Sequence, residues 1–143
     1  MLKQSTVFAV LLATCLVCAG RQETLQDLMA RCESAKVDDR PAVCVEVAER
    51  QLKSADDLYT AGKVDEARSA IKEVVTYAEK AHDAAMQSGK RVKNTEIDFR
   101  KMAAKLRDIK RTVNFDDQEP LQAAAERLES LRTDLLTHMF KGK

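Results

Sequence analysis

Apolar side chains recur at every third or fourth position along most of the chain, which is the spacing of one face of an α-helix. These runs end where glycine, proline or clustered polar residues interrupt them. No stretch of useful length alternates apolar and polar residues as a β-strand would. The pattern predicts an all-α protein of about five helices, over 24 to about 36, 41 to about 61, 64 or 65 to 87, 94 or 95 to about 113, and 117–120 to 140.

The predicted helices differ in their inward faces. The second and third carry mixed small and branched residues, namely Val43 or Cys44, Val47, Ala48, Leu52, Ala55 and Leu58, then Ala67, Ile71, Val74, Ala78, Ala81 and Ala85. The fourth and fifth carry longer side chains, namely Phe99, Met102, Leu106, Ile109 and Val113, then Leu121, Ala124, Leu128, Leu131, Leu135 and Met139. Such stripes suit long antiparallel helices packed at a shallow angle. We expect an antiparallel helical bundle that ends in a coiled-coil-like hairpin.

The first twenty residues differ from the rest. Lys3 precedes an uninterrupted, largely apolar run from Val7 to Val17, which is followed by small residues. This order is typical of a cleavable signal peptide. The run is well short of the ~20 residues that a membrane-spanning helix needs. We predict a signal peptide over 1–20, cleavage after Ala19 or Gly20, and a helical domain over 21–143 that is periplasmic or secreted.

Lipidation at Cys18 is an alternative to release. Lipoproteins are cut before a cysteine that follows a small residue, usually with leucine three positions before it. Val17 and Cys15 occupy those two positions here. The sequence therefore favours release of a soluble protein over a lipid anchor.

Removal of the leader leaves two cysteines, Cys32 and Cys44, so only one pairing exists. Export permits disulfides, and a bridge here would close a short loop that includes Pro41 and contribute ~3 kcal/mol. The alternative is a thiol-redox pair, but such cysteines are usually two residues apart. His82 and His138 lie far from both cysteines in the sequence, so we predict a structural disulfide and no metal site.

Charge is distributed unevenly along the chain. Residues 90–111 hold three acidic side chains and nine basic ones, which are Lys90, Arg91, Lys93, Arg100, Lys101, Lys105, Arg107, Lys110 and Arg111. Residues 116–134 hold six acidic and two basic ones. Packing of these two helices would place opposite charges together, and we favour this local neutralisation. The alternative is a basic face for a membrane surface or another polyanion.

The chain as a whole has no charge excess that would direct it to nucleic acid. Loss of Lys3 with the leader leaves 23 of the 24 basic side chains, against 23 acidic ones. There is no tryptophan, and aromatic residues form 4% of the chain, so a base-stacking surface is not expected. We predict no nucleic-acid partner, and we do not favour contact with a membrane.

Residues 48–75 follow a recognisable helix–turn–helix pattern. Small residues, Ala55 and Ala67, stand where the two helices must approach each other. Two large residues, Leu58 and Tyr59, lie near the end of the first helix, and Gly62 makes the turn. The second helix opens with Val64, Asp65 and Glu66 and continues with Ile71 and Val74 on its inward side. The segment resembles a single tetratricopeptide repeat of about 34 residues. It departs from that family at Gln51, Ser54 and Glu79, where an aromatic, an apolar residue and a closing proline are usual.

The resemblance implies a helical hairpin but not the peptide-binding groove of that family. Such repeats normally stack in groups of about three, and the sequence shows no second copy. A similar turn also occurs in unrelated hairpins. The mature chain also resembles small exported bacterial helical proteins of unknown function, a likeness that implies no activity.

The chemical inventory indicates no enzyme. Glycine-rich phosphate loops and metal-binding motifs are absent from the sequence, and we predict no catalytic residue and no cofactor. We expect His82 to be solvated and Met86 to join the core. The pairs Asp38-Asp39 and Asp116-Asp117 are expected to cap helix starts, and Asp56-Asp57 to lie on a polar face.

The leading functional hypothesis is a non-enzymatic exported module that binds a protein partner, whose identity the sequence does not give, or associates with itself. Membrane-surface or polyanion binding through residues 90–111 is one alternative. Thiol-redox chemistry at Cys32 and Cys44 is the other.

Overall fold

The computed structural model describes residues 22–142. The predicted signal peptide, with Ala19 and Gly20 at its end, lies outside the described residues. The chain forms five α-helices and one short 3-10 turn, in the order α1 (Leu25–Ser34), α2 (Arg40–Thr60), α3 (Val64–Ser88), α4 (Val92–Lys110), η1 (Phe115–Asp117) and α5 (Gln118–Lys141). Within residues 22–142 there is no strand, and the predicted all-α bundle is confirmed.

Most helix ends follow the predicted signals. Gly62 and Gly89 adopt positive φ angles of 77° and 67°, a conformation that glycine allows at little cost, and they follow α2 and α3. The predicted start of the fourth helix is wrong by two or three residues, because α4 begins at Val92. Arg91 takes a left-handed conformation with φ 57°, and its carbonyl accepts the backbone N–H of Thr95, so helical bonding begins earlier than the apolar pattern indicates.

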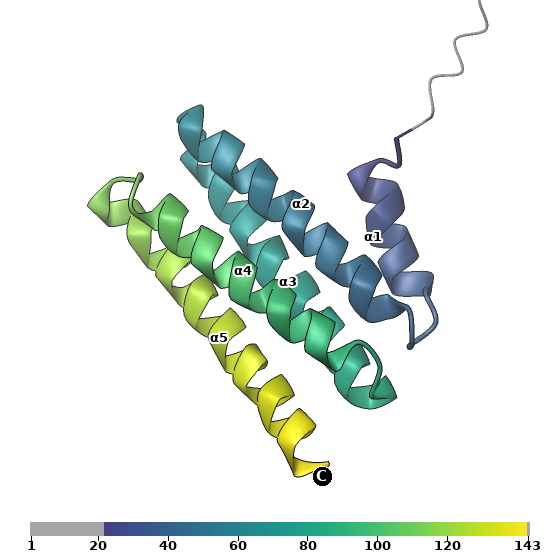
Figure 1. Cartoon of the computed structure of the whole chain (residues 1–143). Coiled ribbons are helices and arrows are strands. Elements are labelled where there is room, and N and C mark those ends of the chain that lie inside the picture. Colours follow the sequence, from purple (N-terminus) through teal and green to yellow (C-terminus); the bar gives the residue numbers. More distant parts are fainter. Residues whose placement is uncertain (1–21, 143) are drawn as a thin grey trace, which may run out of the picture.

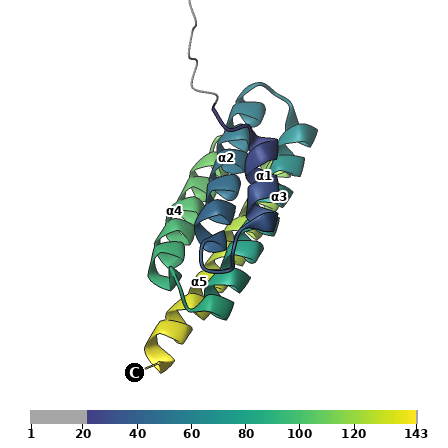
Figure 2. The ribbon, with the colours of Figure 1, turned by 90° about the vertical axis from the view of Figure 1, so that its right-hand side faces the viewer.

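The bundle consists of two antiparallel hairpins stacked on one another (Figure 1). The first hairpin is α2–α3, and it contains the predicted hairpin segment 48–75. The second is α4–α5. Stacking places α4 beside α2 and α5 beside α3, so that neighbouring helices of different hairpins run in the same direction. The short helix α1 packs against α2 on the outside of the bundle, as Figure 2 shows.

The core follows the predicted stripes and adds to them. The predicted inward residues of α3 are all buried, as are those of α4 and α5 apart from the half-buried Val113 and Met139 near the helix ends. Val43 and Leu58 of α2 are only partly buried. Buried residues that the pattern missed are Pro41, Val45, Gln51, Ala70, Tyr77, Ala84, Val92, Thr95, Glu96, Ala103 and Ala125. Many of them widen a predicted stripe, because each of the helices α2 to α5 contacts more than one neighbour.

Helix α1 is attached covalently to the bundle. Cys32 of α1 and Cys44 of α2 form a disulfide, which confirms the predicted pairing. The Thr24 hydroxyl oxygen caps α1 by accepting the backbone N–H of Asp27 at 3.1 Å. Leu28 and Cys32 are the residues that α1 buries fully.

Candidate functional site

The nine basic residues predicted as a face on residues 90–111 separate into two groups. Three of them have a carboxylate partner. Lys105 Nζ lies 2.7 Å from Asp56 Oδ2 of α2, Arg107 Nη2 lies 3.3 Å from Glu129 Oε1 of α5, and Arg111 Nη1 lies 2.7 Å from Asp108 Oδ1. Local neutralisation between α4 and α5, which the sequence favoured, therefore involves only Arg107 among the nine.

The other six basic residues have no carboxylate oxygen within 4.0 Å in the described part of the chain. One of them, Lys110, donates instead to the side-chain oxygen of Gln122 at 2.9 Å. The other five are exposed and cluster at the α3–α4 turn and in the first half of α4, namely Lys90, Arg91, Lys93, Arg100 and Lys101. We call these five residues the cationic face.

The shortest ion pair between α4 and α5 joins a basic residue of α5 to an acidic residue of α4. Arg132 of the acidic helix donates from Nε to Glu96 Oε1 of the basic helix at 2.6 Å. Glu96 is 7% exposed, and the hydrogen bond to Glu96 raises the pKa of Arg132. The sequence missed this pair, because 36 residues separate its members and only the register of the hairpin brings them together.

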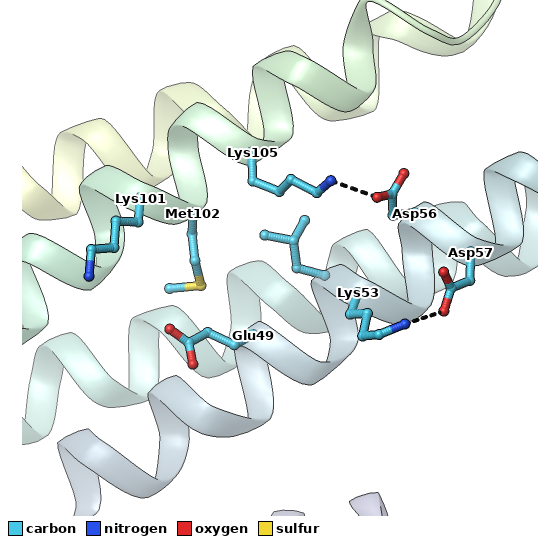
Figure 3. Close-up of a pocket in the computed structure, with 8 residues that line it drawn as sticks. Glu49, Lys53, Asp56, Asp57, Lys101, Met102 and Lys105 are labelled. Atoms are coloured by element: carbon cyan, nitrogen blue, oxygen red, sulfur yellow. Dashed lines mark hydrogen bonds and ion pairs between the residues drawn. The ribbon is translucent and has the colours of Figure 1, made fainter.

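A shallow groove of about 420 Å³ lies between the parallel helices α2 and α4 (Figure 3). Leu52 and Met102 supply its apolar surface. Part of its rim is neutralised, because Lys105 bonds Asp56 and Lys53 Nζ bonds Asp57 Oδ2 at 2.9 Å. The pair Asp56-Asp57 thus lies on a polar surface as predicted, with each carboxylate engaged by a lysine.

Two carboxyl groups near this groove carry perturbed pKa values. Burial raises the pKa of Glu49, and the nearby Asp98 raises it further, whereas Lys101 acts in the opposite direction. Burial likewise raises the pKa of Asp98. The shift of the Glu49 pKa therefore arises from desolvation and like charge, and the shift of the Asp98 pKa arises from desolvation.

A second groove, of about 490 Å³, lies between the parallel helices α3 and α5. Its apolar lining comes from both helices, namely Ile71, Val75, Pro120, Ala123 and Ala124. Its rim holds three basic side chains and Thr76, and we call the whole the α3/α5 groove. No feature of the sequence identified it, because the residues on its two sides are about fifty positions apart.

The charges on the rim of the α3/α5 groove are only partly neutralised. Arg68 Nη2 lies 2.6 Å from Asp117 Oδ1, and Arg127 Nε lies 2.8 Å from Glu79 Oε1. Lys72 is exposed and has no carboxylate within 4.0 Å among residues 22–142. The groove thus combines an apolar floor with one unneutralised positive charge.

The expectation that His82 is solvated is wrong. His82 is not solvated, because its side chain is 12% exposed between Asp83 and Asp134, with Nδ1 3.0 Å from Asp83 Oδ1 and Nε2 3.6 Å from Asp134 Oδ2. Met86 is half-buried against the core. Packing of α5 over α3 covers the histidine, and the pattern of α3 alone does not show this.

The aspartates at helix starts also behave differently from the expectation. Asp39 and Asp117 occupy the N-cap positions of α2 and α5, but neither side chain caps a backbone N–H. The carboxylate of Asp117 is instead drawn to Arg68. A charged partner on another helix competes successfully with the local amides.

Cys32 and Cys44 belong to the core, and both are fully shielded from solvent. No cluster of three or more His, Cys, Asp or Glu side chains that could hold a metal ion occurs within residues 22–142. None of the helices described here has both the length and the hydropathy to cross a membrane.

Comparisons of the chain with models of protein families, with curated proteins and with solved structures found no match.

Proposed function

We propose that this chain is a non-enzymatic, exported helical module that binds a protein partner through the α3/α5 groove. The observation that carries the proposal is the groove itself, an apolar depression bordered by basic side chains. Grooves between helices are a common docking place for amphipathic segments of partners. Export rests on the predicted signal peptide and agrees with the Cys32–Cys44 disulfide.

The chemistry of the groove defines the partner segment. Val75, Pro120 and Ala123 provide contact for apolar side chains that recur at helical spacing. Lys72 remains available to a carboxylate of the partner, whereas the neighbouring Arg68 and Arg127 already have acidic partners within the chain. The occupant is therefore an amphipathic segment with an acidic residue beside its apolar face.

The stacking of the two hairpins supports a binding role. Parallel packing of α2 with α4 and of α3 with α5 resembles the way in which helical repeats stack and leave grooves between equivalent helices. Kinship of segment 48–75 with tetratricopeptide repeats would fit this arrangement. However, α2 and α3, at 21 and 25 residues, extend well beyond the resembling segment.

The thiol-redox alternative has less support. Exchange requires a thiolate to reach a sulfur atom of the disulfide, and reactive cysteines are partly exposed. Here both residues are covered by the core.

The test is selection of random displayed peptides of about four helical turns on the protein. We expect enriched peptides to carry apolar residues at helical spacing together with Asp or Glu. Ala123→Arg should abolish their binding by filling the groove from an exposed position, whereas the matched control Ala104→Arg on α4 should not.

Charge reversal at Lys72 adds a second, independent readout. Lys72→Glu should weaken the acidic peptides and shift a repeated selection towards basic ones, since the unneutralised charge of the groove changes sign. The proposal is wrong if no peptides are enriched, or if the enriched peptides bind Ala123→Arg as well as they bind the unaltered protein.

A further inference from the structure

A second surface of the bundle is suited to a different kind of partner. The cationic face lies on α4 and the α3–α4 turn, away from the α3/α5 groove. We propose that this face docks the protein on a membrane surface rich in anionic phospholipid headgroups.

The charges of the cationic face are available to a partner. The structure pairs Lys105, Arg107 and Arg111 with carboxylates and leaves the cationic face without one inside 4.0 Å in the described chain. Because exposed ion pairs cancel most of the field of their members, the basic character of α4 is concentrated in its first half. A chain whose mature form is nearly neutral thus presents one local positive surface.

The cationic face follows one side of a helix. Lys93, Ile97, Arg100, Lys101 and Ala104 recur at helical spacing and share one side of α4. Asp98 is half-buried, and Glu49 of α2 lines the same groove as Lys101. Ile97 and Ala104, which lie between the cations, are apolar, as on helices that lie in the headgroup layer.

An exposed apolar side chain lies at the same end of the bundle. The Arg132–Glu96 pair fixes the antiparallel register of α4 and α5, and this brings the C-terminal turn of α5 to the end where α4 begins. Phe140 in that turn is 70% exposed, and Lys141 follows it. An exposed aromatic side chain at the same end of the bundle as several cations favours a lipid surface over a nucleic acid, which would use stacked aromatic side chains.

The experiment is co-sedimentation of the protein, purified from cells that express the full chain, with vesicles of phosphatidylcholine alone or mixed with phosphatidylglycerol. We expect sedimentation only with the anionic vesicles, and release as the salt concentration rises from about 0.05 to about 0.5 M. The triple variant K93Q/R100Q/K101Q should bind about a hundredfold more weakly, given the contribution of each cation near an anionic surface.

A matched variant removes the same number of charges from the same helix. K105Q/R107Q/R111Q lacks the three paired cations and should retain most of the binding. Every altered position is half-exposed or exposed, and thermal unfolding by circular dichroism should confirm that both triple variants are folded.

Several outcomes would overturn the proposal. They are absence of sedimentation with the anionic vesicles, sedimentation that salt does not reverse, and equal losses in the two triple variants. Binding to soluble polyphosphate that is tighter than binding to the vesicles at the same salt concentration would also overturn it, since it would assign the cationic face to a soluble polyanion.

Discussion

Loss of the Cys32–Cys44 disulfide should release α1 and leave the α2–α5 bundle folded. Helix α1 has ten residues, fewer than the ~12–15 that an isolated helix needs to be even marginally stable in water. It packs against α2 and buries only Leu28 and Cys32 fully. The bundle has its own core around Phe99 and Leu128, to which α1 contributes little.

The size of the effect follows from the loop that the disulfide closes. Its cysteines are 12 positions apart, for which the chain-entropy treatment gives ~3 kcal/mol. Burial of Leu28 holds α1 with ~2 kcal/mol. The ion pairs that join α1 to the bundle, Arg31 with Glu46 and Glu33 with Lys80, are largely exposed and add at most about 1 kcal/mol each. Reduction should therefore increase the opening equilibrium of α1 about a hundredfold.

Amide hydrogen exchange measured by mass spectrometry checks this expectation. Under reducing conditions the amides of 28–35 should exchange about a hundredfold faster, while those around Phe99 keep their protection. The variant C32A/C44A should behave like the reduced protein and serves as a control for effects of the reductant. Unchanged protection in α1 would refute the reasoning, as would simultaneous unfolding of the entire bundle.

Two further predictions concern charged groups between helices. Arg132→Met should destabilise the fold by about 2–3 kcal/mol in urea unfolding, because Glu96 would stay buried without its partner. The double variant E96M/R132M should recover most of this loss. A double variant as unstable as Arg132→Met would contradict the explanation. Glu49→Gln should raise the melting temperature at pH 7, with a gain below about 1 kcal/mol because Glu49 is exposed. A carboxyl whose pKa is raised in the folded state costs stability only when it is ionised. The stability gained by Glu49→Gln should therefore be absent at pH values below 4.5. It should appear as the pH rises from 4.5 through the raised pKa of Glu49.

The fold was largely predictable from local pattern. Phe99, Met102, Leu106 and Ile109 recur at helical spacing, and all four are buried. Gly62 and Gly89 mark turns because they adopt backbone angles that other residues take only at a cost. These signals are contained within one helix or one turn, so they can be recognised without knowledge of the neighbours.

The burial of charged and polar residues was not predictable in this way. Glu96 lies outside the apolar stripe of α4, so the pattern does not mark it as buried. Its burial depends on the ion pair with Arg132 in another helix. His82 and Asp117 likewise acquire their surroundings from α5 and α3, respectively. In each case the deciding contact joins residues far apart in the sequence, and its geometry depends on how the hairpins stack.

The α3/α5 groove also depends on that stacking, and its composition bears on its role. Ala123 and Ala124 are the residues that α5 places beside Ile71 and Val75. A leucine at the exposed Ala123 would bury additional apolar surface against the bundle, worth about 1–2 kcal/mol. The short side chain of Ala123 forgoes that stabilisation, whereas Ala124 is already buried in the inward stripe beside Leu121 and Leu128. Positions that sacrifice packing within a regular element are expected at functional surfaces. Ala123 therefore favours a role of the α3/α5 groove in binding over a role in holding the hairpins together.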